Sequence, residues 1–191
     1  VFKIMARKKE YKEEEVLEKA MYLFWQNGYE NTSMKMLEKE MGINKFSIYS
    51  SFGSKHELFL KTLKCYNSKI KNIFEKLKKA SNGVDDIKEF FYDSVKIGSQ
   101  LGNKKGCLLT NTYNEFSESE DVLIKDEMNV FMSNLKAIFI EKLKADSSKN
   151  EETVLKQANF LLLAKHGLAA ASRVNSQQEI EDYIEMTFNN L

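Results

Sequence analysis

The stretch that most constrains the fold of this chain is residues 32–58, TSMKMLEKEMGINKFSIYSSFGSKHEL. Its first half carries apolar residues at helical spacing, and the run stops at Gly42, which suits the left-handed conformation that ends many helices. Thr32 and Ser33 precede the run and offer N-cap oxygens. The apolar positions are Met34, Leu37 and Met41. This pattern predicts a short helix that ends at Gly42.

A second short helix is expected directly after this bend, over residues 45–51. Asn44 can cap it, and Ile48 and Phe52 fall on one face four residues apart. Two short helices joined by a turn of three or four residues containing Gly form a helix-turn-helix. The opposite face of the second helix carries Phe46, Ser47, Tyr49 and Ser50. We predict that this face contacts DNA.

At these residues the chain resembles the tetracycline-repressor-like (TetR) family of transcriptional regulators. The resemblance runs from VLEKAMYLFWQNGYENTS through GINK to YSSFGSKHEL, which is similar to the family's Tyr-x-x-Phe-x-Ser-Lys-Glu-x-Leu ending with one intervening residue changed. It covers about a quarter of the chain. It implies an all-α fold of about nine helices, with an N-terminal three-helix helix-turn-helix DNA-binding domain and a C-terminal helical domain for ligand binding and dimerisation. Phe46, Met36 and Glu38 depart from the residues common in the family, so its usual base contacts do not transfer.

Eight residues are predicted to contact DNA. The family resemblance implies phosphate and positioning contacts for Thr32, Ser33, Tyr49 and Lys55. The predicted base-reading residues are Lys45, Phe46, Ser47 and Ser50. Phe46 suits apolar contact with a thymine methyl group, although single exposed apolar side chains also occur without a function. The alternative for Tyr49 is packing against the first helix.

We expect three segments along the chain: a leader and basic arm at 1–12, the helix-turn-helix domain at 13–58, and an effector-binding and dimerisation domain at 59–191. Val1 to Ile4 precede Met5 and are expected to lie before the natural start. The arm can reach phosphates or a minor groove, or it can be a disordered solubilising tail. Its basic residues are Arg7, Lys8, Lys9 and Lys12.

The absence of Pro and the presence of only 8 Gly in 191 residues suit long helices. Apolar periodicity predicts them over residues 13–27, 55–80, 85–100, 119–145, 151–172 and 177–190, with a further short helix after residue 107. A loop containing Gly98, Gly102 and Gly106 is expected before Cys107.

Charge is uneven along the chain, although the net charge is only +1. Residues 61–80 hold seven Lys and one Glu, whereas residues 81–191 hold 12 basic and 18 acidic residues. A basic helix beside an acidic body lets one end of a molecule approach DNA while the other end repels it.

The helix expected at residues 151–172 contains five consecutive apolar residues, Phe160 to Ala164, which a helix buried on one face would not carry. We predict that a two-fold related copy covers its second face, so that the protein is a homodimer. The alternative is an interior helix of a monomer. A dimer would require a pseudo-palindromic DNA site with half-sites about one helical turn, ~34–36 Å, or a multiple apart. The predicted interface residues are Phe160, Leu161, Leu163, Gly167, Ala170, Ile180, Tyr183 and Ile184.

The resemblance also implies a pocket for a small, often hydrophobic effector where the C-terminal helices converge. An effector regulates only if it binds the DNA-competent and DNA-incompetent states with different affinity, and the long helix shared by both domains is expected to transmit the difference. For each lining residue, ordinary core packing is the alternative. The candidates are Tyr66, Phe90, Phe91, Cys107, Asn111, Tyr113 and Phe131.

Cys107 is the second residue of a Gly-Cys-Leu-Leu segment, which is similar to one found in a subset of the family. It follows Lys104 and Lys105 and precedes a predicted helix, a setting that favours a thiolate open to electrophiles or oxidants. A small buried thiol is the alternative.

Enzymatic function has little support in the sequence. It shows no nucleotide-binding Gly loop, no nucleophile signature and no paired catalytic carboxylates, so we predict no catalytic residue, metal or cofactor. No apolar run approaches the ~18 residues of a membrane span, and we expect a cytoplasmic protein. The expected function is a repressor that leaves its operator when an effector binds. A helical dimer or adaptor without DNA binding is the second class to test.

Overall fold

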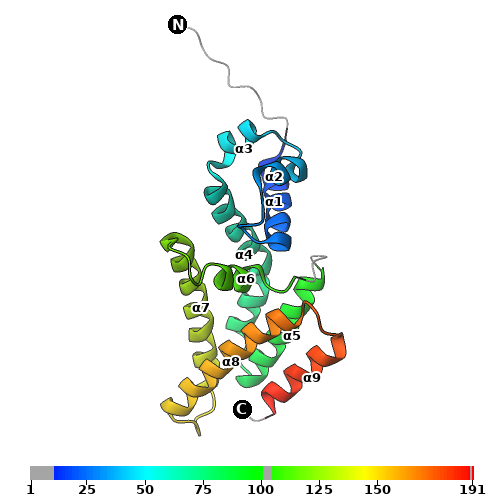
Figure 1. The fold of residues 1–191 in the computed structure, drawn as a ribbon. Coiled ribbons are helices and arrows are strands. Elements are labelled where there is room, and N and C mark those ends of the chain that lie inside the picture. The colour runs from blue at the N-terminus through cyan, green and yellow to red at the C-terminus, as the bar shows by residue number, and fades with distance from the viewer. Residues whose placement is uncertain (1–10, 101–104, 190) are drawn as a thin grey trace. The chain divides into compact units, whose positions relative to one another are not determined.

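The computed structural model describes residues 11–100, 105–189 and 191, and these form nine α-helices and no strand (Figure 1). The expected all-α fold is confirmed. The leader Val1 to Ile4, the arm residues Arg7, Lys8 and Lys9, and Gly102 and Lys104 lie outside the described residues. The helices are α1 Glu13–Asn27, α2 Met34–Met41, α3 Lys45–Phe52, α4 Lys55–Lys79, α5 Val84–Gln100, α6 Leu108–Glu115, α7 Val122–Leu143, α8 Glu151–Ala171 and α9 Gln177–Phe188.

The chain divides into two compact units, Val1–Cys65 and Tyr66–Leu191, and the division falls inside α4. The boundary expected after residue 58 falls inside the same helix. The N-terminal unit therefore contains α1, α2, α3 and the first part of α4, and the C-terminal unit contains the rest of α4 and α5 to α9.

The core of the N-terminal unit is aromatic and aliphatic. Phe24 of α1 and Phe59 of α4 meet edge to face with ring centroids 4.9 Å apart, and both are buried. Leu37 of α2 and Ile48 of α3 are fully buried as well. Each helix of this unit thus contributes one apolar stripe to a shared core, which fixes the orientation of α3.

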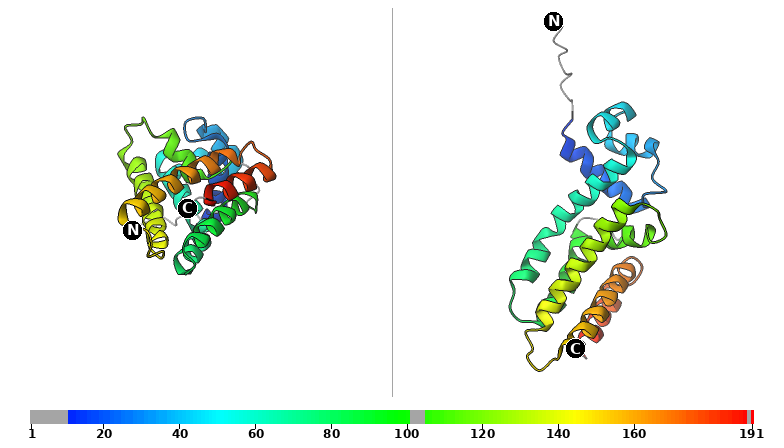
Figure 2. Two further views of the ribbon diagram at one scale, coloured as in Figure 1. Left: turned by 90° about the horizontal axis from the view of Figure 1, so that it is seen from below. Right: turned by 90° about the vertical axis from the view of Figure 1, so that its left-hand side faces the viewer.

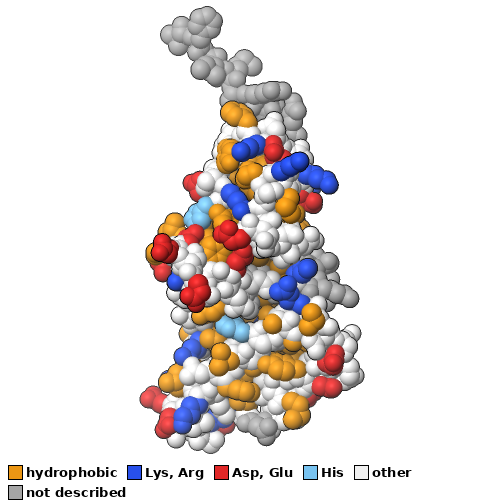
Figure 3. All heavy atoms as spheres, viewed as in Figure 1, with side chains coloured by type: hydrophobic (Ala, Val, Ile, Leu, Met, Phe, Trp, Pro, Cys, Tyr) orange, Lys and Arg blue, Asp and Glu red, His pale blue; other side chains and the backbone are white. Residues whose placement is uncertain are grey.

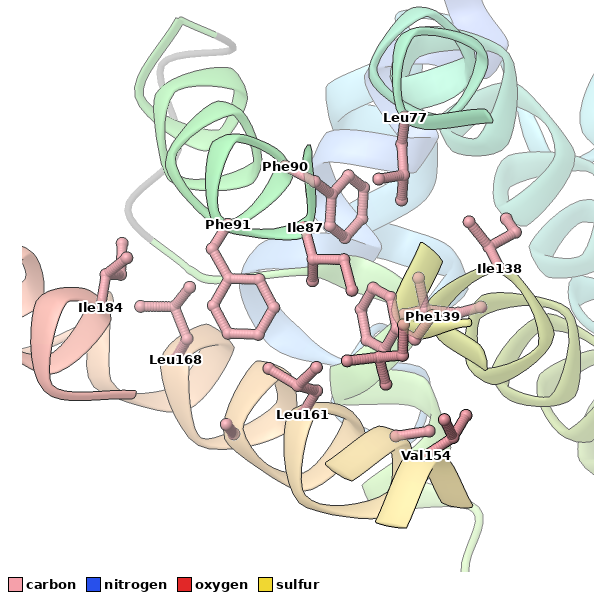
Figure 4. Close-up of a cluster of buried hydrophobic side chains, with 14 of the residues drawn as sticks. Leu77, Ile87, Phe90, Phe91, Ile138, Phe139, Val154, Leu161, Leu168 and Ile184 are labelled. Atoms are coloured by element: carbon pink, nitrogen blue, oxygen red, sulfur yellow. The ribbon is translucent and has the colours of Figure 1, made fainter. Parts of the chain in front are cut away.

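The core of the C-terminal unit brings together side chains from α4, α5, α7, α8 and α9 (Figure 4). Phe91 and Phe139 are fully buried in it, and α8 packs against α7 while α9 packs on α5 and α8 (Figures 1 and 2). Its labelled members in Figure 4 are Leu77, Ile87, Phe90, Phe91, Ile138, Phe139, Val154, Leu161, Leu168 and Ile184.

A buried ion pair also links α5 to α7 in this unit. Lys142 Nζ lies 3.6 Å from Asp86 Oδ2 and donates to the carbonyl oxygens of Lys78, at 3.2 Å, and Ala80. Asp86 Oδ2 also accepts a hydrogen bond from the backbone N–H of Asn82 at 2.8 Å. Both charges are compensated, as burial requires.

Three expected helix limits need correction. Helix α7 begins at Val122 because the Asp121 carboxylate caps it by accepting from the N–H of Ile124, and the chain turns after Leu143. Helix α9 ends at Phe188, and Gly98 lies within α5 instead of the loop. Across the described part of the chain, each helix is too short or too polar to span a membrane.

Candidate functional site

The bend between α2 and α3 is built from local hydrogen bonds. Gly42 takes a left-handed conformation, φ 70° and ψ 22°, and its N–H donates to the carbonyl oxygen of Glu38. Asn44 then caps α3, its Oδ1 accepting from the N–H of Ser47 at 2.9 Å. Ser33 caps α2 in the same way, through the N–H of Met36. The predicted helix-turn-helix is therefore present.

Helix α3 is held to the N-terminal unit from its inner face. Ile48 and Phe52 are buried there. At the C-terminal end of α3, the hydroxyl groups of Tyr11 and Ser51 share a hydrogen bond of 2.8 Å, and Lys61 Nζ donates to the carbonyl oxygens of Ser51 and Phe52. The helix is thus fixed along its length while its outer face stays open.

The outer face of α3 carries the predicted base-reading residues. Phe46 is 81% exposed, and Tyr49 is 43% exposed. Lys45 and Ser50 are exposed and Ser47 is half-buried, while Lys45 Nζ lies 5.6 Å from the centroid of the Tyr49 ring. The face therefore combines a cation, hydroxyl groups and an apolar ring, which are the chemical groups that read base edges in a major groove.

The predicted positioning residues fall into two groups. Ser33 is exposed at the N-terminus of α2, and the half-buried Lys55 places its Nζ 4.2 Å from the centroid of the Tyr29 ring. Thr32 is a correction: its side chain is fully buried, and its hydroxyl group donates to the carbonyl oxygen of Gly28 at 2.6 Å. This bond closes the turn between α1 and α2, so the Thr32 side chain is not available to a phosphate.

A small cavity of about 30 Å³ lies among α4, α5, α6, α7 and α8 in the C-terminal unit. Four of the predicted pocket residues surround it: Tyr66, Phe90, Cys107 and Phe131. The other lining residues are Ile70, Ile73, Phe74, Ser94, Ile97, Thr110, Met132, Leu135, Lys165 and His166. The wall is mainly apolar, with polar groups at one side.

Three predicted pocket residues lie away from this cavity. Phe91 packs in the core, with its ring centroid 5.0 Å from that of Phe188. Asn111 Nδ2 donates to the carbonyl oxygen of Lys105 at 2.8 Å, which ties the loop before α6 to that helix. The Tyr113 ring lies against His166, with centroids 5.6 Å apart. The position of each residue around its helix directs its side chain to these other partners.

The sequence analysis did not identify Lys165 and His166. Lys165 is only 7% exposed, and burial lowers its pKa, an effect opposed by nearby Cys107. Burial and the adjacent Lys165 lower the pKa of His166, whose Nε2 lies 3.0 Å from Met132 Sδ. A signal for Lys165 was available, because it continues the buried stripe of α8. That stripe is Val154, Ala158, Leu161, Lys165 and Leu168.

Cys107 occupies the N-cap position of α6, as its sequence context suggested, and it is half-buried. The loop before it approaches α8 closely: a Cβ at Gly106 would lie 2.2 Å from the carbonyl oxygen of Ala169. Burial raises the pKa of Tyr66 well above its usual value, with a further contribution from the neighbouring Cys107. Tyr66, Cys107 and Lys165 therefore form one polar corner of the cavity.

Helix α8 also has an exposed apolar stripe, which we define as Phe160, Leu163, Gly167 and Ala170. Phe160 is 50% exposed and Leu163 is 69% exposed, and Figure 3 shows hydrophobic side chains gathered over the face made by α8 and α9. Leu161, Ile180 and Ile184 belong instead to the core of their own chain, which corrects their assignment to an interface. Tyr183 is half-buried, and its hydroxyl donates to the carbonyl oxygen of Ala164 at 2.9 Å.

Residues 16–62, which contain the helix-turn-helix, match the model of the family described as bacterial regulatory proteins, tetR family. This segment of the chain is of the TetR family. Membership of a family of regulatory proteins agrees with the expectation that this chain is not an enzyme. The family resemblance inferred from the sequence is confirmed.

Two curated proteins extend this TetR-family assignment. Over 109 residues the chain is 31% identical to the uncharacterized HTH-type transcriptional regulator YezE of Bacillus subtilis, a match that spans 56% of each chain. It is 26% identical over 139 residues to IcaR of Staphylococcus aureus, the biofilm operon icaADBC HTH-type negative transcriptional regulator, with 72% of this chain and 74% of IcaR covered.

Solved structures of TetR-family regulators share the fold. A cysteine mutant of CifR complexed with 26-bp double-strand operator DNA superposes with a TM-score of 0.83 at 21% identity, over 96% of this chain and 98% of CifR. The reduced form of Escherichia coli NemR superposes with a TM-score of 0.75 at 20% identity, over 93% and 95% of the two chains. At these identities the likeness establishes the fold.

Proposed function

We propose that this TetR-family protein is a cytoplasmic transcriptional repressor that inserts α3 into the major groove of an operator. The observation that carries the proposal is the division of α3 into two faces: Ile48 and Phe52 are buried, whereas Phe46 and Tyr49 are exposed. A helix fixed by its inner face presents its outer side chains in one orientation, as base reading requires. The relatives support a DNA-binding repressor, since IcaR is a negative transcriptional regulator and a CifR mutant was solved in complex with operator DNA.

The proposed contact set follows from exposure. Lys45, Phe46, Ser47 and Ser50 read base edges, and Ser33, Tyr49 and Lys55 position the phosphate backbone. Thr32 is left out because its side chain is buried.

We further propose that two copies pair through the α8 stripe. Gly167 and Ala170 allow a partner helix to approach, and Phe160 and Leu163 supply apolar area that is exposed in the single chain. A two-fold dimer carries two α3 helices and selects a pseudo-palindromic operator.

The cavity of the C-terminal unit is the proposed effector site. Its volume of about 30 Å³ is small, so a ligand with an extended apolar body must displace side chains of the surrounding helices. Helix α4 belongs to both units, and a ligand that prefers one position of α4 shifts the population between DNA-competent and DNA-incompetent states.

The test is selection of bound DNA from a random pool, followed by gel-shift titration of the selected duplex. We expect a pseudo-palindrome, binding that weakens steeply as salt rises, and at least tenfold weaker binding by Tyr49→Ala. The matched control is Tyr113→Ala, which removes a tyrosine outside the helix-turn-helix. If the pool yields no duplex while the chain still dimerises, the helical adaptor class replaces the repressor.

Sedimentation velocity tests the dimer separately. Leu163→Asp should yield a folded monomer, because Leu163 is 69% exposed in the single chain and its substitution leaves the core intact. Lys144→Asp, at an exposed position just after α7 and outside the α8 stripe, is the control and should stay dimeric.

Thiol sensing is a second way in which this pocket can respond, and the position of Cys107 on the cavity wall favours testing it. An electrophile such as N-ethylmaleimide should release DNA from the wild type and not from Cys107→Ser. Equal release from both proteins would remove Cys107 from the mechanism.

A further inference from the structure

The C-terminal unit buries two lysines in different ways. Lys142 is 5% exposed and satisfied by Asp86 and two backbone carbonyl oxygens. Lys165 is 7% exposed, yet within the described ranges no carboxylate forms an ion pair with it. Its Nζ lies 5.9 Å from the centroid of the Phe90 ring, and Cys107 is nearby. Burying an ammonium group without an anion is unfavourable. Stability of the fold does not account for such a group.

The surroundings of Lys165 limit what its partner can be. The amine lines a cavity whose other lining side chains are mainly aromatic and aliphatic, among them Phe74, Phe131 and Ile97. The titratable groups that share the cavity are Tyr66, Cys107 and His166. None of the three is a carboxylate, and burial favours the neutral forms of Tyr66 and His166.

We infer that this cavity binds a small molecule with one carboxylate group and an apolar body, and that the carboxylate pairs with Lys165. The inference rests on the proposed effector role of the pocket. The carboxylate of the ligand would form the ion pair that Lys165 lacks within the described chain. The apolar body would pack against the aromatic and aliphatic side chains that line the cavity. A cationic ligand is repelled by Lys165, and a neutral ligand leaves the buried charge without a partner.

The charge of a ligand therefore determines whether this pocket binds it. Pairing with an anion also reverses the effect of burial on Lys165, because an adjacent negative charge favours the ammonium form. Because side chains of α4 line the cavity, a ligand that widens it displaces them, and this displacement can shift α4.

The experiment is calorimetric titration of the full chain, without DNA, with 2-naphthoate, indole-3-acetate and decanoate and with the matched amide of each. We expect at least one acid to bind at least tenfold more tightly than its amide. Lys165→Met should abolish that preference while it preserves amide binding, and Lys165→Arg should keep part of it. Lys156→Met, at an exposed lysine on α8, should behave as the wild type.

Three results would overturn the inference: no acid binds at millimolar concentration, acids and amides bind equally, or Lys165→Met leaves the preference unchanged. A further result against it is that Lys165→Met slows alkylation of Cys107 by iodoacetamide at least tenfold without altering acid binding. The role of Lys165 would then be to promote the reactivity of the Cys107 thiol. Gel shifts with the selected duplex are run separately, so an acid that binds without releasing DNA would contradict the effector role and leave the ligand assignment standing.

Discussion

The carboxylate of Glu38 in α2 accepts a hydrogen bond from the backbone N–H of Lys45 in α3 at 2.5 Å. The first turn of a helix has N–H groups without intrahelical partners, and a negative charge there is favoured by the helix dipole. Glu38 therefore fixes the start of α3 from the neighbouring helix. Glu38, which departs from the residues common in the family, therefore has a structural role in this chain.

Replacing Glu38 by Ala should lower the free energy of unfolding by about 1 kcal/mol, because the N–H of Lys45 loses its partner. The measurement is urea denaturation followed by circular dichroism. Glu40→Ala, an exposed position on the same helix, is the control and should change stability by less than about 0.5 kcal/mol. Equal effects of the two substitutions would show that Glu38 contributes only charge.

Phe46 and Ile48 should separate DNA binding from stability. Phe46→Ala removes a side chain that is 81% exposed, so we expect a stability change within about 0.5 kcal/mol and a roughly tenfold loss of operator affinity. Ile48→Ala empties a fully buried site and should cost about 2–5 kcal/mol. Urea denaturation and gel shifts measure both quantities. Unchanged operator affinity in Phe46→Ala would exclude this ring from the interface.

The pair formed by Lys142 and Asp86 should be intolerant of single substitutions. Lys142→Met leaves the Asp86 carboxylate buried with only the Asn82 N–H as a partner, and we expect a loss of about 3–5 kcal/mol. Lys144→Met, at an exposed position just after α7, should be close to neutral. Thermal denaturation of the two variants checks the difference, and similar melting temperatures would contradict it.

The hydrogen bond from the Tyr92 hydroxyl to Glu185 Oε1, at 2.5 Å, joins α5 to α9 and raises the pKa of Tyr92 to about 12. An unfolded Tyr has a pKa near ~10. The bond therefore contributes fully below about pH 10, and its contribution is lost as the pH rises toward about 12. Because the site is solvent-accessible, we expect about 1 kcal/mol or less. The stability difference between wild type and Tyr92→Phe should shrink between pH 9 and pH 11.5, and a constant difference would contradict the assignment.

His166 should report on Lys165. Burial and the adjacent Lys165 lower the pKa of His166, so the folded state prefers the neutral ring, and stability falls as acidification below about pH 6.5 protonates the unfolded chain first. In Lys165→Met the pKa of His166 should rise. The chain has 2 His, so His56→Gln identifies the His166 signal in an NMR titration. A pKa that stays the same would show that Lys165 carries no charge near the ring.

Features that depend on neighbouring residues were predictable. Asn44 and Gly42 act on N–H and carbonyl groups within a few positions of themselves, so the limits of α2 and the start of α3 follow from local chemistry. The same reasoning could not tell whether Thr32 or Ser33 caps α2, since both carry a hydroxyl group before that helix. The turn after α1 places the carbonyl oxygen of Gly28 within hydrogen-bond distance of the Thr32 hydroxyl, so Ser33 is the residue that caps α2.

The sequence alone determined the helical pattern, the DNA-binding motif and the outward position of Phe46, because helix periodicity and capping operate over one or two turns. Tertiary packing decided which neighbouring residue faces which space. Phe90 reaches the cavity whereas Phe91 enters the core, and Leu163 is exposed whereas Leu161 is buried. Such residues differ by a rotation of one or two positions around a helix, and only the helices packed on either side select one face over the other.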